Sequence, residues 1–332
     1  MKKFKYSVLD LAPVKQGKTI NDTFQDSLDL ARHTEDLGYE RFWLAEHHNM
    51  ASIASSATSV LIGYIAGGTK SIRVGSGGVM LPNHSSLVIA EQFGTLESLF
   101  PGRIDLGVGR APGTDGLTAK ALGRNPATIN EQFPRQIKEL QQYFSEDNHR
   151  APVRAIPGEG CHIPVYILGS STDSAWLASE MGLPYAFAGH FAPDQMEMAF
   201  EIYHQNFTPS RYLEKPYTIA CVNGIAAKSD AEAQQLATTL YMGFTNIIRD
   251  QRQPFSPPID DIDNYWNPME KAHVLRMLRY SLIGGPESIG QGLKNFQNRF
   301  MTDELMFTSH IYDHEKRKDS YTIIKEATEV LF

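Results

Sequence analysis

Cysteine is scarce in this sequence of 332 residues, which contains only Cys161 and Cys221 and no Cys-x-x-Cys pair. Two separate cysteines cannot build a disulfide framework, and this usage is typical of proteins that stay in a reducing compartment. We therefore expect a cytoplasmic protein. The sequence has no run of roughly 18 apolar residues, the length that a membrane span needs. The basic start is followed by Asp10 and Pro13, where a signal peptide would be continuously apolar.

An excess of positive charge is also missing. The chain has 31 Lys and Arg against 38 Asp and Glu, which gives a formal net charge of -7. Proteins that bind nucleic acid usually present a basic surface, so we expect neither nucleic acid nor a membrane among the partners. Hydrophobic residues make up 42% and charged residues 21% of the chain. This is ordinary globular composition, and it excludes disordered and collagen-like classes.

Short apolar segments alternate with segments of helical periodicity. The apolar segments are rich in β-branched residues and lack strict polar alternation, as in parallel strands that are buried on both faces. The expected strands are residues 4–9, 41–45, 72–81, 104–108, 164–168, 185–188, 217–226 and 304–310. The expected helices are residues 22–38, 85–99, 128–144, 172–181, 193–206, 230–241, 286–300 and 314–330, with Asp22 as the cap of the first.

Strands that are each followed by a helix predict a (β/α)8 TIM barrel. An open doubly wound sheet is the alternative, and the lack of a Gly-x-Gly-x-x-Gly after the first strand disfavours it. Two connections, residues 111–127 and 244–271, are longer than plain barrel loops, and such loops are commonly functional. No linker or repeat divides the sequence, so we expect one domain, residues 1–332, with these two insertions.

Polar residues follow the expected strands at the end where barrel enzymes place their chemistry. They are Glu46, His47, His48 and Asn49 after the second strand, Asn83 and His84 after the third, Arg110 after the fourth, residues 169–174 after the fifth, His190 after the sixth, and Asn223 within the seventh. We therefore expect an active site at this end of the barrel.

Glu46, His47 and His48 form the densest of these clusters. Neighbouring residues of an extended segment point to opposite sides, so one histidine is expected to face the barrel mouth and the other to pack outward. A neutral imidazole can act there as an acid, a base or a hydrogen-bond donor. Two alternatives stay open. One is a packed, hydrogen-bonded histidine pair, and the other is a metal site formed by His47, His84 and His190, whose spacing matches no common metal motif.

Residues 169–174, Gly-Ser-Ser-Thr-Asp-Ser, lie between an expected strand and helix. Small residues expose backbone N–H groups, hydroxyls add donors, and a helix N-terminus carries partial positive charge, so this segment predicts a phosphate-binding loop. Arg110 strengthens the prediction, because a guanidinium matches phosphate geometry. The alternatives are an ordinary serine cap for the loop, and an ion pair with Asp105 or Asp115 for Arg110.

Glycine is dense inside the third expected strand, at Gly75, Gly77 and Gly78. Glycine weakens a strand, so a run of glycines needs a reason. A flat ligand against the backbone, a β-bulge and a non-proline cis peptide bond are three such reasons. Close packing against a bulky neighbour is the alternative.

Several of these segments together resemble the bacterial luciferase-like flavin-dependent monooxygenases. Residues 42–49, Phe-Trp-Leu-Ala-Glu-His-His-Asn, are similar to that family's Trp-Leu-x-Glu-His-His signature. Residues 74–82, 101–110 and 169–178 are similar to its third-strand, fourth-strand and phosphate-loop motifs, and residues 303–306 and 313–320 to its closing strand and helix. The motifs keep the family's order over nearly the whole chain.

The resemblance implies roles for individual residues. His47 matches the family's catalytic histidine, with Glu46 beside it as a second implied catalytic residue. The implied cofactor-binding residues are Gly77, Gly78, Arg110, Gly169, Ser170, Ser171 and Ser174, and the Gly77-Gly78 bond matches a non-proline cis peptide beneath the flavin ring. Residues 244–271 match a mobile lid. Gly109 stands where light-emitting α subunits carry a reactive cysteine, which indicates a single-chain, non-luminescent member.

The same resemblance implies the chemistry. Reduced FMN from a separate NAD(P)H flavin reductase would react with O2, through a C4a-peroxyflavin, to oxygenate a small organic substrate that the sequence does not identify. A homodimer is implied as well, and no metal is expected. Two alternatives stay open, an F420-dependent dehydrogenase and a non-catalytic flavin-binding protein, and a metal hydrolase is a remote third.

Overall fold

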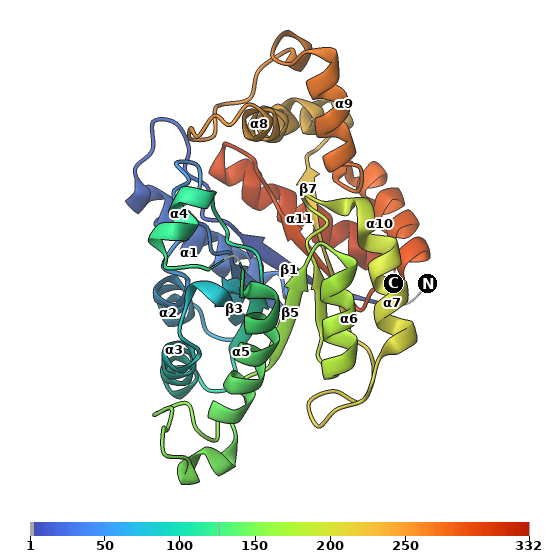
Figure 1. Cartoon of the computed structure of the whole chain (residues 1–332). Coiled ribbons are helices and arrows are strands. Elements are labelled where there is room, and N and C mark those ends of the chain that lie inside the picture. Colours follow the sequence, from blue (N-terminus) through green and yellow to red (C-terminus); the bar gives the residue numbers. More distant parts are fainter. Residues whose placement is uncertain (1–2, 126, 332) are drawn as a thin grey trace.

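In the computed structural model, which describes residues 3–125 and 127–331, eight parallel strands close into a barrel (Figure 1). They are β1 (Lys5–Asp10), β2 (Arg41–Leu44), β3 (Arg73–Met80), β4 (Ile104–Gly109), β5 (Val165–Gly169), β6 (Tyr185–Phe187), β7 (Thr218–Ala226) and β9 (Glu304–Thr308). The ring closes because β9 pairs with β1 and β7, and β7 also pairs with β6. The predicted (β/α)8 barrel is confirmed, and the alternative of an open sheet is wrong.

Helices join the strands and cover the outside of the barrel (Figure 1). They are α1 (Ile20–Asp36), α2 (Thr58–Gly68), α3 (Ser86–Leu99), α4 (Gly116–Ala121), α5 (Ile129–Tyr143), α6 (Thr172–Met181), α7 (Met196–Asn206), α8 (Asp230–Ile248), α9 (Pro268–Met277), α10 (Pro286–Phe300) and α11 (His314–Leu331). Short 3-10 turns lie at Leu81–Asn83, Glu146–Arg150, Pro193–Gln195 and Ile262–Asn264.

The first helix shows how the sequence sets an element's ends. Gly38 has a φ of +75° and follows α1, as predicted. The cap, however, is Thr19 and not Asp22. The Asp22 N–H donates to the Thr19 hydroxyl at 3.1 Å, and the Asp22 carboxylate accepts from the Thr19 N–H at 2.8 Å. The pair forms a reciprocal capping box, in which Asp22 occupies the third helical position.

Four elements were not predicted: α2, α4, α9 and β8 (Leu282–Gly284). The sequence of α2 is apolar on nearly every side and starts without a capping side chain, so it carries no periodic signal and no start signal. Strand β8 has three residues and pairs with the end of β7, outside the barrel ring. Helix α4 lies within the predicted insertion 111–127. The insertion 244–271 contains the end of α8 and the start of α9. Residues 1–2, 126 and 332 of the expected domain lie outside the described residues.

Side chains of the barrel strands alternate between two environments. An inner cluster fills the barrel with Leu9, Leu11, Trp43, Ala45, Tyr166, Ala186, Ile219, Cys221 and Met306. The larger cluster lies between the strands and the surrounding helices and includes Val8, Phe42, Leu44 and Phe307. This alternation fixes which residues beyond each strand's carboxyl end face the barrel interior.

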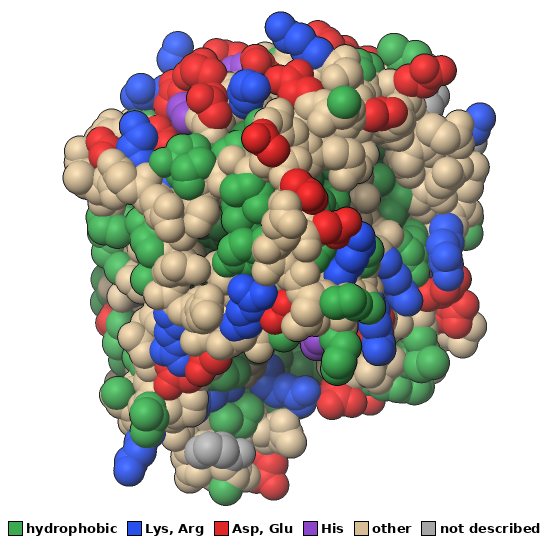
Figure 2. All heavy atoms as spheres, turned by 90° about the horizontal axis from the view of Figure 1, so that it is seen from above, with side chains coloured by type: hydrophobic (Ala, Val, Ile, Leu, Met, Phe, Trp, Pro, Cys, Tyr) green, Lys and Arg blue, Asp and Glu red, His purple; other side chains and the backbone are tan. Residues whose placement is uncertain are grey.

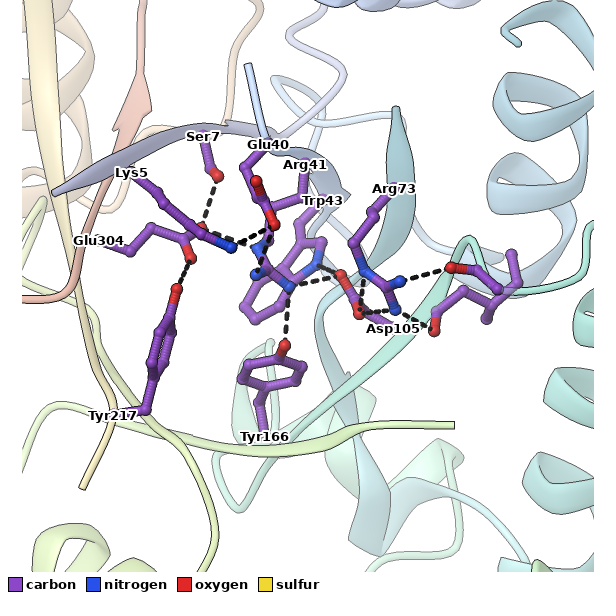
Figure 3. Close-up of polar contacts among 12 residues, drawn as sticks. Lys5, Ser7, Glu40, Arg41, Trp43, Arg73, Asp105, Tyr166, Tyr217 and Glu304 are labelled. Carbon is purple, nitrogen blue, oxygen red and sulfur yellow. Dashed lines mark hydrogen bonds and ion pairs between the residues drawn. The ribbon is translucent and has the colours of Figure 1, made fainter. Parts of the chain in front are cut away.

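The amino-terminal end of the barrel is filled by a buried network of charges (Figure 3). The Arg41 guanidinium donates to Asp105 and to Glu304, each at 2.8 Å, and to the Tyr166 hydroxyl at 2.8 Å. Arg73 donates to Asp105 at 2.6 Å and 3.0 Å. Because buried charges are tolerated when they are paired and hydrogen-bonded, we assign this end of the barrel to stability.

The opposite face carries the carboxyl ends of the strands. Figure 2 views the molecule from above, from the side on which α8 and α9 lie in Figure 1, and shows acidic and basic side chains interspersed around apolar ones. Within residues 3–125 and 127–331, no helix combines the length and the apolar character that a bilayer span requires.

Candidate active site

His47 lies beyond the end of β2 and faces the barrel mouth. Trp43 and Ala45 point into the barrel, and His47 continues their register. Its backbone N–H donates to the Ser55 carbonyl at 2.9 Å, and its Nδ1 makes a long contact of 3.4 Å with the Gly113 carbonyl oxygen. Burial lowers the pKa of His47, so its imidazole is neutral at neutral pH. A proton on Nδ1 would leave Nε2 as an acceptor toward the mouth.

Glu46 points to the other side of the same segment and holds its neighbours in place. Its carboxylate accepts hydrogen bonds from His48 and His84, each with a distance of 2.9 Å to Oε1, and from the Met80 N–H at 3.0 Å. Burial raises the pKa of Glu46, but the hydrogen bonds from these histidines outweigh burial and keep that pKa below its usual value. The predicted catalytic role of Glu46 stays a prediction, and the geometry gives it a positioning role.

The two histidines therefore divide as expected. His48 packs outward against Glu46, and His47 remains in the mouth. The metal alternative finds no support in the described part of the chain, where the potential ligand atoms grouped within 4.8 Å belong to Asp29, His314 and Glu315 on the surface.

A segment of the first insertion is fastened onto the loop that carries His47. The Gly113 carbonyl accepts from the His48 N–H at 3.0 Å, and the Thr114 hydroxyl donates to the His48 carbonyl at 2.8 Å. Gly113 has a φ of +66°, and a Cβ there would lie 2.7 Å from the Glu46 carbonyl oxygen. Only glycine fits this position, which the sequence pattern does not reveal.

The phosphate-binding loop predicted at residues 169–174 joins β5 to α6. Ser171 occupies the N-cap position, but its hydroxyl makes no capping hydrogen bond, and the Gln195 side chain accepts from the Thr172 N–H at 3.1 Å instead. The Ser174 hydroxyl donates to the Ser171 carbonyl at 2.7 Å and lies 2.9 Å from the Tyr185 hydroxyl. Gly169 is required beneath it, because a Cβ there would lie 2.1 Å from Ser174 Oγ. The hydroxyls of Ser170, Ser171 and Thr172 are thus left for a ligand.

Arg110 follows β4 beside this loop. Its guanidinium donates to Asn130 at 3.0 Å and to Asp173 at 3.3 Å, and the Asp173 side chain is 71% exposed. The suggested partners Asp105 and Asp115 are wrong, because Asp105 pairs with Arg41 and Arg73, and Asp115 pairs with Arg252. An exposed pair of this kind is weak, so a phosphate can compete with Asp173 for the guanidinium.

Arg124 is a further basic residue here that the sequence reasoning missed. It is buried and donates to the Arg110 carbonyl, to the Ala111 carbonyl at 3.0 Å and to Asn83 Oδ1 at 2.8 Å. These bonds fix the backbone that carries Arg110. Arg124 lies in a Gly-rich connection without a periodic pattern, so its partners could not be inferred from spacing.

The peptide bond between Gly77 and Gly78 is cis, as expected from the resemblance. The pairing of β3 with β4 also shifts register between Ser76 and Val79. Close packing accounts for the glycines themselves. A Cβ at Gly77 would lie 2.7 Å from Leu9 Cδ1, and one at Gly78 would lie 2.7 Å from the Gly107 carbonyl oxygen. A cofactor contact at Gly77 and Gly78 stays a prediction.

Two more histidines share the mouth with His47. His190 follows β6, and His310 follows β9. Burial, with contributions from the neighbouring His310 and His47, lowers the pKa of His190 to about 3. Burial, with a contribution from Arg317, lowers the pKa of His310 to about 4. Both imidazoles are therefore neutral at neutral pH.

The second insertion lies over this mouth. Phe255 pairs with the chain near β1 through two backbone hydrogen bonds of 2.9 Å, to Val14 and from Gln16, and its ring lies 5.1 Å from the His310 ring. Arg252 donates to Asp115 of the first insertion at 2.8 Å. The two insertions thus meet above the residues described here.

Comparison with known proteins identifies the family to which the chain is similar. A family model described as luciferase-like monooxygenase matches residues 4–303. The chain is 54% identical over 321 residues to the uncharacterized protein YvbT of Bacillus subtilis (strain 168), covering 96% of this chain and 95% of that protein. It is 48% identical over 326 residues to a luciferase-like monooxygenase of Escherichia coli (strain K12), with 98% and 97% covered. At 31% identity over 329 residues, with 97% of both covered, it is similar to an N-acetyl-S-alkylcysteine monooxygenase of B. subtilis (strain 168).

Solved structures share the fold. The structure of apo-MsnO8 has a TM-score of 0.88 at 33% identity, with 98% of both chains covered. Two others show the fold alone. One is the oxygenating constituent of 3,6-diketocamphane monooxygenase from Pseudomonas putida in complex with FMN, at 16% identity and a TM-score of 0.75, with 98% and 97% covered. The other is an F420-dependent secondary alcohol dehydrogenase. It has 13% identity and a TM-score of 0.73, and the match covers 98% of this chain and 99% of that chain. With a family model that spans most of its length and relatives of this closeness, the chain belongs to the luciferase-like monooxygenase family.

Proposed function

We propose that this protein is a two-component, FMN-dependent monooxygenase, which uses reduced FMN from a separate NAD(P)H flavin reductase and O2 to oxygenate a small organic substrate. The observation that carries the proposal is the pairing of an anion-binding corner with a neutral histidine at one end of the barrel. The corner consists of Arg110, the Ser170 and Ser171 hydroxyls and the start of α6, where the Ser171 hydroxyl makes no capping hydrogen bond. The histidine is His47.

The anion-binding corner fits the phosphate of FMN. A guanidinium and hydroxyl donors match phosphate oxygens, and the start of a helix adds partial positive charge. The first N–H of α6, on Thr172, donates to the Gln195 side chain at 3.1 Å, so a phosphate that used this N–H would displace Gln195. Phosphate would displace Asp173 from Arg110, which is a small cost for an exposed pair.

The protein's own contribution is orientation, proton handling and exclusion of water. Reduced flavin supplies the activation of O2 when it is bound. His47 holds a proton at one ring nitrogen and an acceptor at the other, in a buried site where its pKa is below the usual value. Phe255 and the rest of the second insertion cover the mouth, which keeps bulk water from the reacting groups.

A homodimer is part of the same proposal. The outer faces of α2 and α3 expose apolar side chains, with Val60 at 69%, Tyr64 at 38%, Val88 at 44% and Leu99 at 64% exposed. Neighbouring exposed apolar side chains of this kind mark association surfaces. Sedimentation of the wild type and of Val60→Asp tests this, and a dimer that persists unchanged in the variant would place the interface elsewhere.

The proposal is tested by titrating the purified protein with oxidised FMN, reduced FMN and F420 while following fluorescence. Tighter binding of reduced FMN, lost in Arg110→Ala, is the expected result. Oxygen uptake with an added flavin reductase is then coupled to loss of a ketone, an aldehyde or an N-acetyl-S-alkylcysteine. Preference for F420 would replace the proposal by a dehydrogenase, and flavin binding without oxygen-coupled substrate loss by a non-catalytic flavin-binding protein.

A further inference from the structure

Three polar side chains at the barrel mouth have no assigned task in the proposed function. They are His190, Asn223 and His310, which lie on or just beyond the adjacent strands β6, β7 and β9. Each has a buried polar atom without a hydrogen-bond partner in the described residues: Nδ1 of His190, Oδ1 of Asn223 and Nδ1 of His310. Such atoms are rare in folded proteins, because leaving one unpaired is costly.

The register places these three side chains on one patch of the interior. Asn223 follows Ile219 and Cys221 on the inner side of β7 and pairs with Thr308 of β9, two residues before His310. The Asn223 Nδ2 group donates to the His190 carbonyl at 2.6 Å and to the Ser281 hydroxyl at 3.3 Å. Since a carbonyl can only accept, the unpaired atom of the Asn223 amide is its oxygen.

The patch is polar but uncharged. Burial keeps both imidazoles neutral. The Arg317 guanidinium, which acts on His310, lies in α11 outside the barrel, where it donates to Asp10 at 2.7 Å and to the Ser309 carbonyl at 3.0 Å. Its charge is thus already matched by a buried carboxylate. An anionic group on the patch would lose its water without gaining a cation.

The groups on offer define the complementary ligand. Asn223 Oδ1 accepts only, and each neutral imidazole provides one donor and one acceptor. A hydroxyl or a secondary or primary amide satisfies this set, because each carries both an N–H or O–H donor and an acceptor oxygen. A ketone or an ether lacks the donor, and a carboxylate or sulfonate lacks it and carries an unmatched charge.

We infer that Asn223, His190 and His310 form a substrate subsite that binds an uncharged hydrogen-bond donor of the substrate, a hydroxyl or an amide. The inference rests on the proposed function, because it names the class of substrate that this same barrel mouth receives. Phe255 lies against His310 and closes the subsite from above. The polar group of the substrate therefore lies on the interior side of the mouth. The rest of the substrate lies toward the second insertion.

Four probes of equal chain length test the subsite: hexanamide, 1-hexanol, hexanoate and 1-hexanesulfonate. Binding to the full-length protein is followed by saturation-transfer NMR at neutral pH, with and without saturating FMN. We expect hexanamide and 1-hexanol to bind and to compete with each other, and the two anions to bind at least about tenfold more weakly. Tighter binding of an anion, or no binding of either uncharged probe, would overturn the inference.

Two variants and a matched control locate the binding. His310→Phe keeps a ring against Phe255 and removes both ring nitrogens, and Asn223→Leu removes the unpaired oxygen at similar size. Each is expected to weaken hexanamide binding about tenfold or more. Ser309→Ala is the control. Ser309 also has a buried, unpaired hydroxyl, but it lies on the outer side of its segment, beside Arg317, and not on the patch. Equal binding by the control and both variants would contradict the inference.

Measuring the FMN affinity of the wild type and of each variant separates a failure of the subsite inference from a failure of the proposed function. If FMN binds normally but the probes do not, the subsite fails and the flavin assignment stands. If FMN does not bind to the wild type, the flavin assignment fails. Binding of the four probes without FMN then still tests the subsite. Should Asn223→Leu not fold, as judged by circular dichroism, His310→Phe decides alone. If neither variant folds, competition between the four probes on the wild type decides.

Discussion

The Arg252 guanidinium donates to the Asp115 carboxylate at 2.8 Å, and this ion pair joins the two insertions across the barrel mouth. Asp115 also caps α4 by accepting from the N–H groups of Leu117 and Thr118, and it accepts from Asn49 at 3.1 Å. These hydrogen bonds, led by that from the Thr118 backbone, keep the pKa of Asp115 well below its usual value. Arg252 therefore binds a carboxylate that is fixed to the loop beside His47.

Loss of this pair should loosen the covering insertion without unfolding the barrel. In Arg252→Ala we expect chymotrypsin to cleave after Phe255 several times faster, while the melting temperature stays nearly unchanged, because exposed ion pairs add little to global stability. Arg276→Ala is the control, since Arg276 forms a surface ion pair with Asp194 at 2.6 Å that does not involve the covering insertion. Equal cleavage in both variants would show that Arg252 does not hold the insertion.

Arg110 and Asp173 are expected to affect FMN binding in opposite directions. Arg110→Ala should weaken binding about tenfold or more, because it removes a charged donor to phosphate. Asp173→Asn should preserve or tighten binding, because it removes the carboxylate that competes for Arg110 at 3.3 Å. Both affinities are measured by flavin fluorescence. Unchanged affinity in Arg110→Ala would place the phosphate elsewhere.

His47 should matter for turnover and not for cofactor binding. In His47→Ala we expect substrate oxygenation to fall by about a hundredfold, the usual range for loss of an acid–base group, while FMN affinity changes by no more than a few-fold. The neighbouring histidine offers a matched control, because His48 points outward onto Glu46. His48→Gln should retain most of the turnover. Normal turnover in His47→Ala would make that residue structural.

The buried neutral histidines should make the fold sensitive to acid. His310 has a folded pKa of about 4, against an ordinary value of 6.5. Between these values the unfolded chain binds the proton more readily, so stability is fully present above pH 6.5 and is lost as the pH falls toward 4. The loss from His310 amounts to about 3 kcal/mol at most.

Urea unfolding between pH 7 and pH 4 measures this loss. His310→Phe should reduce the slope of unfolding free energy against pH by up to about 1.4 kcal/mol per pH unit, because one titrating group is gone. His190, with a pKa of about 3, continues to contribute in that variant. Ser309→Ala should keep the wild-type slope. The same slope in His310→Phe would show that His310 is not a buried neutral group.

The barrel strands could be predicted from sequence because each is a short apolar segment with clear ends. Their alternation predicted that one of His47 and His48 faces the mouth, and the family resemblance pointed to His47. The helices α2 and α4 could not be predicted, since α2 has no polar face and α4 has only six residues within a glycine-rich connection. The sequence predicted a phosphate-binding site from Arg110 and residues 169–174, and the structure places them next to each other. The occupied hydroxyl of Ser174 and the support that Arg124 gives to Arg110 depend on contacts between distant segments.

For Asn223 and His310 too, the sequence predicted the strands but not the hydrogen-bond partners of the side chains. Their strands were predicted, and Asn223 was noted as a polar residue in an apolar segment. Whether its amide is satisfied depends on the His190 carbonyl and on Ser281, 58 residues further along the chain. No local pattern encodes a missing partner.

The charge network at the amino-terminal end of the barrel determines from which end small molecules can reach the interior. Arg41, Asp105 and Glu304 occupy the axis there with almost no exposed surface, at 3%, 0% and 0%. A molecule that reached the interior from that side would have to separate buried opposite charges. We therefore expect the substrate and the product of the proposed reaction to enter and leave through the opposite end of the barrel, where Arg252 and Phe255 lie.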